Sequence, residues 1–158
     1  MSAKKRTQYR ILGKILFVLY IIFVFYFLLI SEVYGRSSEM QEYHYNLVLF
    51  KEIKRFWNYR EQLGTFATVT NLLGNVLVFL PFGFFMPMAS KYRSFLNTSF
   101  YSLALSLIVE MSQLFMKVGC FDVDDLLLNT IGGMMGYIAF SICNIARRNY
   151  AKKEKRKR

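Results

Sequence analysis

The sequence predicts an all-α integral membrane protein with four transmembrane helices and an interfacial helix before the second. The chain of 158 residues is 54% hydrophobic, above the roughly 45–50% that is usual for soluble domains, yet its net charge is +11. The two properties are segregated: residues 15–30 carry no charge, whereas residues 147–158 are mostly Lys and Arg. This segregation excludes an ordinary soluble domain, a disordered chain and a disulfide scaffold.

Four segments are long and apolar enough for membrane-spanning helices, which need about 20 mostly apolar residues. The first is too long for the apolar region of a cleaved signal peptide, and no small-x-small cleavage site follows it, so we expect a retained helix. We treat residues 1–158 as one membrane domain. Its predicted spans are residues 11–30, 67–88, 95–116 and 126–146, followed by a basic tail at 147–158.

The basic residues predict a multi-pass protein of the cell membrane with both termini in the cytoplasm. Fifteen of the 21 Lys and Arg residues lie in the N-terminal flank, the loop after the second span and the C-terminal tail, and positive charge favours the cytoplasmic side. Residues 32–66 and the loop 117–125 then face outward. The tail directly follows a span, so we assign it to topology and to anionic lipid rather than to nucleic acid.

The outer segment between the first two spans is rich in aromatic and basic residues between Tyr43 and Tyr59. Phe50, Ile53 and Trp57 follow helical spacing. We expect a helix lying in the membrane interface with its rings at headgroup depth. A re-entrant loop or a water-exposed turn is the alternative.

Polar residues of three predicted helices fall at one depth in the outer leaflet. The rise of about 1.5 Å per residue places them within roughly 12 Å of the outer surface. Because polar groups inside a membrane are costly, this shared depth predicts one outward-facing polar pocket. Its predicted binding residues and carboxylates are Asn71, Asn75, Glu110, Gln113, Asp122, Asp124, Asp125 and Asn129.

Most of these residues also have a purely structural interpretation. An Asp at the start of the fourth helix can cap it, and the amides can join helices by hydrogen bonds. Gly132, Gly133 and Gly136 form a small-residue face that favours close helix packing. Glu110 is harder to explain structurally, because a buried carboxylate must be protonated, hydrogen-bonded or hydrated. A proton-transfer role would suit it.

Several motifs resemble those of the VanZ-like family over about residues 40–140. The second predicted helix carries Asn-Leu-Leu-Gly-Asn at 71–75, followed by Phe-Leu-Pro-Phe-Gly at 79–83. The second half carries Glu-Met-Ser-Gln at 110–113, Asp-Val-Asp-Asp at 122–125 and Asn129. Asn46 to Phe50 is similar to the family's outer Asn-Leu-x-Pro-Phe motif, with Leu49 in place of the Pro.

The resemblance implies a small bacterial protein of the cell envelope. The family's namesake lowers susceptibility to the glycopeptide antibiotic teicoplanin, so antibiotic resistance is one expected role. The resemblance establishes no catalytic residue. It does add Asn46 to the predicted binding residues.

Two classes of function follow, and neither names a cofactor. The first is a protein that binds or modulates a lipid-linked envelope component or a glycopeptide, with membrane lipids as further partners and no nucleic acid. The second is a membrane enzyme acting on a lipid-linked cell-wall substrate, with Glu110 and Asp122 or Asp124 as acid, base or metal ligands. The acids at 122–125 are a weak signal for Mg²⁺ or Ca²⁺. A small transporter subunit is a minor third possibility.

Overall fold

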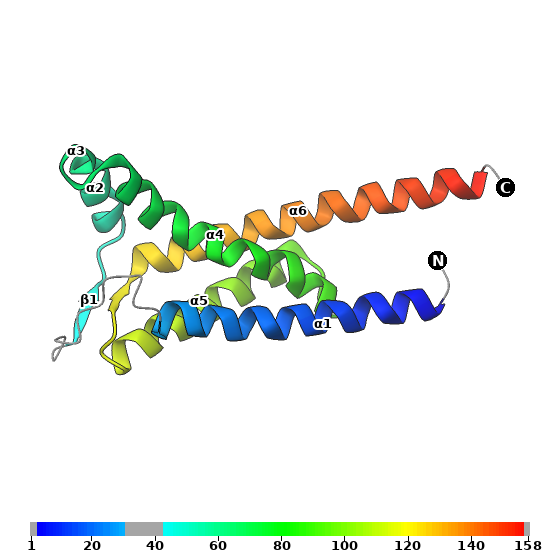
Figure 1. Cartoon of the computed structure of the whole chain (residues 1–158), viewed down its shortest axis with the longest axis horizontal. Coiled ribbons are helices and arrows are strands. Elements are labelled where there is room, and N and C mark those ends of the chain that lie inside the picture. Colours follow the sequence, from blue (N-terminus) through cyan, green and yellow to red (C-terminus); the bar gives the residue numbers. More distant parts are fainter. Residues whose placement is uncertain (1–2, 31–42, 157–158) are drawn as a thin grey trace.

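The computed structural model describes residues 3–30 and 43–156 and shows a mostly helical protein. Its long helices lie side by side along one axis (Figure 1). Both ends of the described chain lie at one end of this bundle, and the short elements gather at the other. The long helices are α1 (Ala3–Phe25), continued by the π-helical turn η1 (Tyr26–Ile30), α4 (Thr65–Ala89), α5 (Phe95–Phe115) and α6 (Val123–Arg156).

Three helices in the described part of the chain are long and apolar enough to cross a membrane. Their apolar windows are Ile11–Leu28, Thr68–Ala89 and Val123–Glu154. The remaining predicted span, at residues 95–116, corresponds to α5, which runs along the bundle with the others but carries a row of buried polar residues that lowers its hydropathy. These residues are Thr98, Ser102, Ser106, Glu110 and Gln113.

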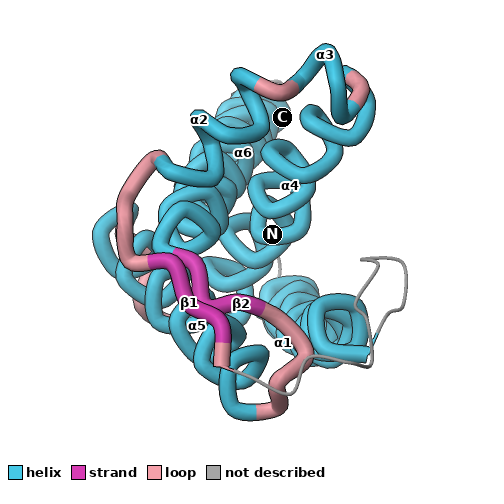
Figure 2. The backbone as a smooth tube through the Cα atoms, turned by 90° about the vertical axis from the view of Figure 1, so that its left-hand side faces the viewer, coloured by secondary structure: helices cyan, strands magenta, loops and turns pink. Residues whose placement is uncertain are grey.

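A small parallel sheet joins two loops at the end away from the termini (Figure 2). Strand β1 (His44–Asn46) pairs with β2 (Cys120–Asp122), with Asn46 opposite Asp122. The predicted helical fold is confirmed for most of the described chain, but the prediction did not include this small sheet. Strands of three residues are too short to produce a detectable alternation of apolar and polar residues, and their partners lie far apart in the sequence.

Two short helices follow the first strand. Helix α2 (Lys51–Asn58) lies within the predicted interfacial segment, and α3 (Arg60–Leu63) extends it toward α4. The expected apolar face is only partly buried: Ile53 is half-buried, whereas Phe50 and Trp57 are exposed. Gly64, at φ 85°, makes the turn into α4 in a conformation that favours glycine.

Glycine contacts between α4 and α6 confirm the packing interpretation of the small-residue face. A Cβ atom on Gly132 would lie 2.2 Å from the carbonyl oxygen of Val76, and one on Gly136 would lie 2.0 Å from that of Leu80. A Cβ atom on Gly83 of α4 would lie 1.8 Å from the carbonyl oxygen of Gly133. Only glycine permits the two backbones to approach so far, as in other membrane helix pairs.

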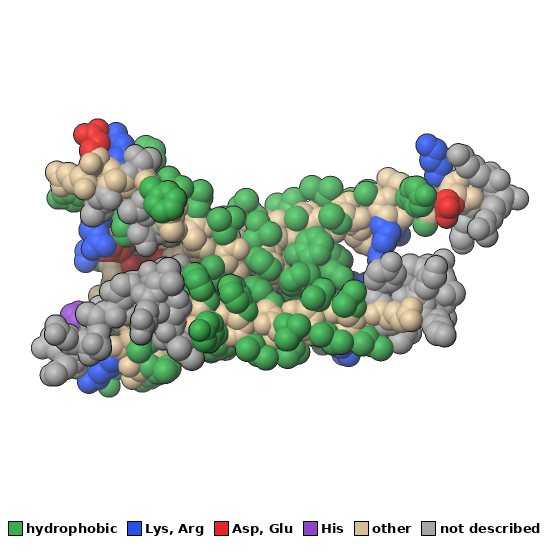
Figure 3. All heavy atoms as spheres, in the orientation of Figure 1, with side chains coloured by type: hydrophobic (Ala, Val, Ile, Leu, Met, Phe, Trp, Pro, Cys, Tyr) green, Lys and Arg blue, Asp and Glu red, His purple; other side chains and the backbone are tan. Residues whose placement is uncertain are grey.

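The apolar side chains divide between a core and an outer surface. The core includes Val24, Phe79, Phe82 and Val109, which are buried where α1, α4 and α5 meet. Many other large apolar side chains point outward and cover the middle of the bundle, while charged residues lie at its two ends (Figure 3). Such an extensive apolar surface fits contact with lipid.

Candidate functional site

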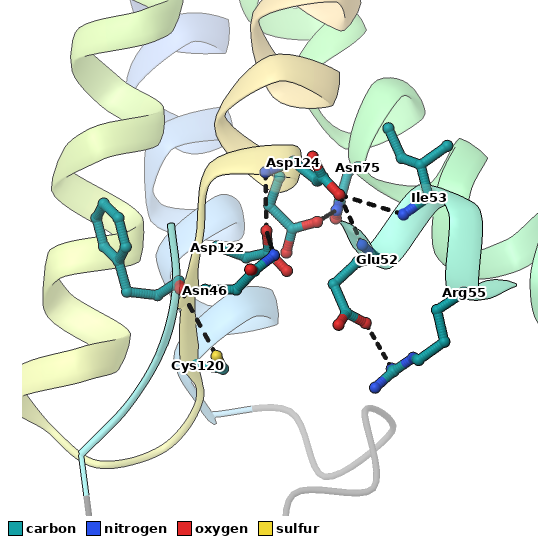
Figure 4. Close-up of polar contacts among 10 residues, drawn as sticks. Asn46, Glu52, Ile53, Arg55, Asn75, Cys120, Asp122 and Asp124 are labelled. Carbon is teal, nitrogen blue, oxygen red and sulfur yellow. Dashed lines mark hydrogen bonds and ion pairs between the residues drawn. The ribbon is translucent and has the colours of Figure 1, made fainter. Parts of the chain in front are cut away.

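Buried carboxylates from three elements lie together where the sheet joins the bundle. Figure 4 shows two of them, Asp122 and Asp124. Glu110 comes from the last turns of α5, Asp122 from β2, and Asp124 and Asp125 from the first turn of α6. Glu110, Asp122 and Asp124 are at most 7% exposed. The structure therefore brings together the three residues that the sequence predicts as catalytic in an enzyme.

Asp122 caps helix α6. Its Oδ1 atom accepts a hydrogen bond from the backbone N–H of Asp124 at 2.8 Å and one from the side-chain amide of Asn46 at 3.0 Å. Its own backbone N–H donates to Oε2 of Glu110 at 3.1 Å. The predicted capping role thus belongs to Asp122, the residue immediately before the helix, where a side-chain oxygen can reach the N–H two residues ahead.

Asp124 caps a different helix, α2. Its two carboxylate oxygens accept backbone N–H bonds from Phe50 at 2.5 Å, Glu52 at 2.8 Å and Ile53 at 3.2 Å. Phe50, the residue before α2, contributes no side-chain cap. A negative charge at the positive end of the α2 dipole is favourable, so Asp124 holds the outer segment against α6.

Asn46 links the sheet to the turn that precedes α2. Besides donating to Asp122, it accepts the backbone N–H of Val48 at 3.1 Å. The turn itself forms without the proline of the family motif: the N–H of Lys51 reaches the carbonyl of Val48 at 3.3 Å, and Phe50 adopts φ 64°. The binding role predicted for Asn46 is therefore accompanied by a clear structural one.

The remaining predicted residues occupy the same end at different positions. Asn75 of α4 donates to Asp125, which ties α4 to the start of α6. Gln113 donates instead to the carbonyl of Leu28 in η1 at 3.1 Å. Asn129, one turn deeper, donates to Ser106 at 2.9 Å, and its Oδ1 atom accepts no bond from the described residues. The side chain of Asn71 lies outside the described part of the structure.

Two residues of this end were not predicted as part of the site. Glu52 lies on α2 near the carboxylates and forms an ion pair with Arg55 at 2.6 Å. Ser106 supplies the hydroxyl that Asn129 contacts. The polar periodicity of α5, with Ser106 four residues before Glu110, is the signal that would have found the serine.

Burial and the charges of neighbouring carboxylates raise the pKa values of two groups in β2, Asp122 and Cys120. Burial raises the pKa of Asp122 above its ordinary value, and the charge of Asp124 adds to this effect. Hydrogen bonds from Asp124 and Asn46 to the charged form act in the opposite direction. Burial also raises the pKa of the Cys120 thiol, with further contributions from the charges of Asp122 and Glu110. Both groups thus bind protons more tightly than they would in water.

The arrangement offers little to a metal ion. The described residues contain no group of three or more His, Cys, Asp or Glu side chains that could hold one. Asp122 and Asp124 direct their oxygens at backbone and amide N–H groups, which compete with a cation for the same lone pairs. We therefore assign no metal to the cluster.

An apolar helical bundle with a buried polar network at one end defines a helical membrane protein. The chain belongs to the VanZ/LLP1 family, whose model matches residues 17–144. It is similar to Protein VanZ of Enterococcus faecium, with 33% identity over an alignment of 107 residues that covers 62% of this chain and 66% of that protein. The chain thus spans about two thirds of that relative. No solved structure matches it.

Proposed function

We propose that the chain crosses the cell membrane four times, with both termini in the cytoplasm and the carboxylate network facing outward. The three apolar helices and α5 run along the same bundle, each in the opposite direction to the long helix before it in the sequence, and both termini lie at one end of it. Most Lys and Arg residues belong to that end, which favours its cytoplasmic location. The polar residues of α5 face the other helices, so its lower hydropathy is compatible with a span.

We further propose that the outer end binds a lipid-linked component of the cell envelope and thereby lowers susceptibility to glycopeptide antibiotics such as teicoplanin. The supporting observation is that Glu110, Asp122 and Asn46 form a connected, buried polar network at this single end of an apolar bundle. Carboxylate and amide groups suit the hydroxyls and amides of a sugar or peptide headgroup.

The surface above the network suits the rest of such a ligand. Exposed cationic side chains on α2, among them Lys51, Lys54 and Arg55, can attract a phosphate group, and Trp57 is 62% exposed beside them. The apolar side chains of the bundle then provide contact for a lipid tail. Asp124 holds α2 in this position through its backbone bonds.

The enzyme alternative has less support from the geometry. Asp122 and Asp124 are each engaged by backbone N–H groups as helix caps, so their oxygens already accept structural hydrogen bonds rather than facing a substrate. Glu110, whose Oε2 accepts a bond from Asp122, is the carboxylate with the strongest claim to a role in ligand recognition.

The experiment is to express the chain in a susceptible bacterium and measure the teicoplanin concentration that inhibits growth. We expect the wild type to raise it several-fold over an empty vector. Glu110→Gln should abolish the effect while leaving the protein folded, because the Gln carbonyl can still accept the bond from Asp122.

Ser112→Ala is the matched control on the same helix, because the Ser112 hydroxyl bonds only to its own helix, at the carbonyl of Ile108, among the contacts described. It should protect as well as the wild type. Membrane levels and thermal unfolding of each variant in detergent are measured in parallel. Full protection by Glu110→Gln, or no protection by the wild type, would contradict the proposal.

A further inference from the structure

A second site lies at the other end of the bundle, away from the carboxylate network. A cavity of about 560 Å³ opens there between α1 and α5, with residues of α4 between them. Its lining is almost wholly apolar and includes Phe17, Phe82, Met86 and Leu105. Ala104 leaves room in its α5 wall. The volume falls within the roughly 300–1,000 Å³ typical of ligand pockets.

A single cation lies among the lining residues. Lys14 of α1 lines the cavity near the end of α4, where the neighbouring Gly13 packs against Met88. No ion pair to Lys14 occurs among the described residues. The sequence is consistent with this: it has no Asp or Glu before Glu32 and none between Glu61 and Glu110, so neither α1 nor the turn between α4 and α5 supplies an acid to neutralise Lys14.

The surroundings of Lys14 are also basic. Lys91 and Arg93 follow α4 in the adjoining turn and are exposed. Two hydroxyl-bearing residues, Ser90 and Tyr101, are also among the residues that line the cavity. A cation and hydroxyls beside a long apolar cavity are complementary to an anionic headgroup with a hydrocarbon chain.

We propose that this cavity binds an anionic glycerophospholipid, with one acyl chain between α1 and α5 and the phosphate at Lys14. The ligand comes from the leaflet on the side of the two termini, which is the opposite side from the proposed envelope site. The chain would contact Phe17, Phe82 and Leu105, and the charge of Lys14 would select an anionic headgroup over a zwitterionic one.

The test uses the full chain reconstituted with equal amounts of phosphatidylglycerol and phosphatidylcholine and then analysed by native mass spectrometry. We expect the wild type to retain phosphatidylglycerol several-fold over phosphatidylcholine. Lys14→Gln should retain lipid without this preference. Ala104→Trp should lose the retained lipid, because the ring fills the cavity.

Two variants outside the cavity serve as matched controls. Arg148→Gln removes an exposed positive charge from α6, and Ile142→Trp adds a ring to its exposed face. Both should retain lipid like the wild type, and thermal unfolding shows which variants are folded. Equal retention of both lipids by the wild type, unchanged preference in Lys14→Gln, or a second copy of the chain in place of lipid would overturn the proposal.

Discussion

The carboxylate of Asp124, in α6, accepts the backbone N–H of Glu52, in α2, at 2.8 Å. With the bonds from Phe50 and Ile53, one buried carboxylate satisfies three N–H groups at the start of a helix more than 70 residues away. Free N–H groups at a helix start need acceptors, and α2 finds them in another helix. The position of the aromatic and basic outer segment therefore depends on Asp124.

We expect Asp124→Asn to lower the free energy of unfolding by about 2–3 kcal/mol, because it removes a buried charged acceptor and a helix cap. Hydrogen exchange of the amides of residues 50–53 should accelerate more than that of α5. Glu52→Gln is the control, because it removes the partly exposed ion pair with Arg55 but keeps the backbone N–H that Asp124 accepts. Unchanged protection of α2 in Asp124→Asn would contradict the capping role.

Asp122 should behave differently, because its raised pKa makes its charge unfavourable in the folded state. The folded protein binds this proton more tightly than the unfolded chain, so the contribution to stability is present at low pH and is lost as pH rises through the folded pKa. Asp122→Asn keeps an oxygen for the bonds from Asp124 and Asn46. We expect it to match the wild type near pH 4 and to exceed its stability at pH 7.

Thermal unfolding of the two proteins across this pH range provides the measurement. Asp122→Ala separates charge from capping, because it leaves Asn46 without its acceptor and should cost about 1–3 kcal/mol at every pH. If the wild type instead became more stable relative to Asp122→Asn as pH rises, the pKa of Asp122 would be lowered, not raised, in the folded state.

Much of the helical arrangement could be predicted from hydrophobicity and capping. The span predicted at residues 95–116 corresponds to α5, which begins after Ser94, whose hydroxyl accepts the N–H of Asn97 at 3.1 Å. The end of α6 was less predictable. Apolar residues stop near Ala146, but the helix continues to Arg156, because the Lys, Arg and Glu residues of the tail are good helix formers.

The gathering of polar residues at this end could be predicted from the sequence, but the hydrogen bonds among them could not. The shared depth of polar residues on three helices selected Glu110, Asp122 and Asn75, which the structure places at one end of the bundle. The bond from Asn46 to Asp122 and the capping of α2 by Asp124 join residues more than 70 positions apart, and no local periodicity encodes such pairs. They result from the pairing of β1 with β2.

The turn before α2 offers a stabilising substitution. Leu49 and Phe50 are its central residues, and Phe50 has φ 64°, as the third residue of a type II turn does. Proline is favoured at the position of Leu49 in such turns and restricts the unfolded chain. We expect Leu49→Pro to raise the free energy of unfolding by about 0.4–1 kcal/mol, measured by thermal unfolding. A loss of stability would show that the backbone at Leu49 does not accept proline.

Gly132 tests the close approach of α4 and α6. A methyl group there would lie 2.2 Å from the carbonyl oxygen of Val76, so the backbones must separate. We expect Gly132→Ala to lower the free energy of unfolding by about 1–3 kcal/mol. The control is Met135→Ala, which changes a side chain on the same helix that is 47% exposed and should have a smaller effect. Equal stability of Gly132→Ala and the wild type would exclude the tight crossing.

The two cysteines test the proposed orientation. Cys120 lies in β2 at the end proposed to face outward, and Cys143 lies on α6 toward the end with the two termini. A membrane-impermeant maleimide applied to intact cells should therefore modify Cys120 and leave Cys143 unmodified. Because the pKa of Cys120 is raised, less of it is thiolate at neutral pH, and its modification should accelerate as pH rises toward 9.

The charge of Asp122 provides a second test, through its effect on the reactivity of Cys120. Burial contributes most to the raised pKa of Cys120, and the charge of Asp122 contributes next. In a Cys143→Ser background, Asp122→Asn should therefore speed the modification of Cys120 at pH 7.5, whereas Glu61→Gln, on exposed α3, should not. Cells that express the wild type and are permeabilised before labelling show whether Cys143 reacts once the reagent can reach it. Modification of Cys143 alone in intact cells would reverse the orientation and place the carboxylate network in the cytoplasm.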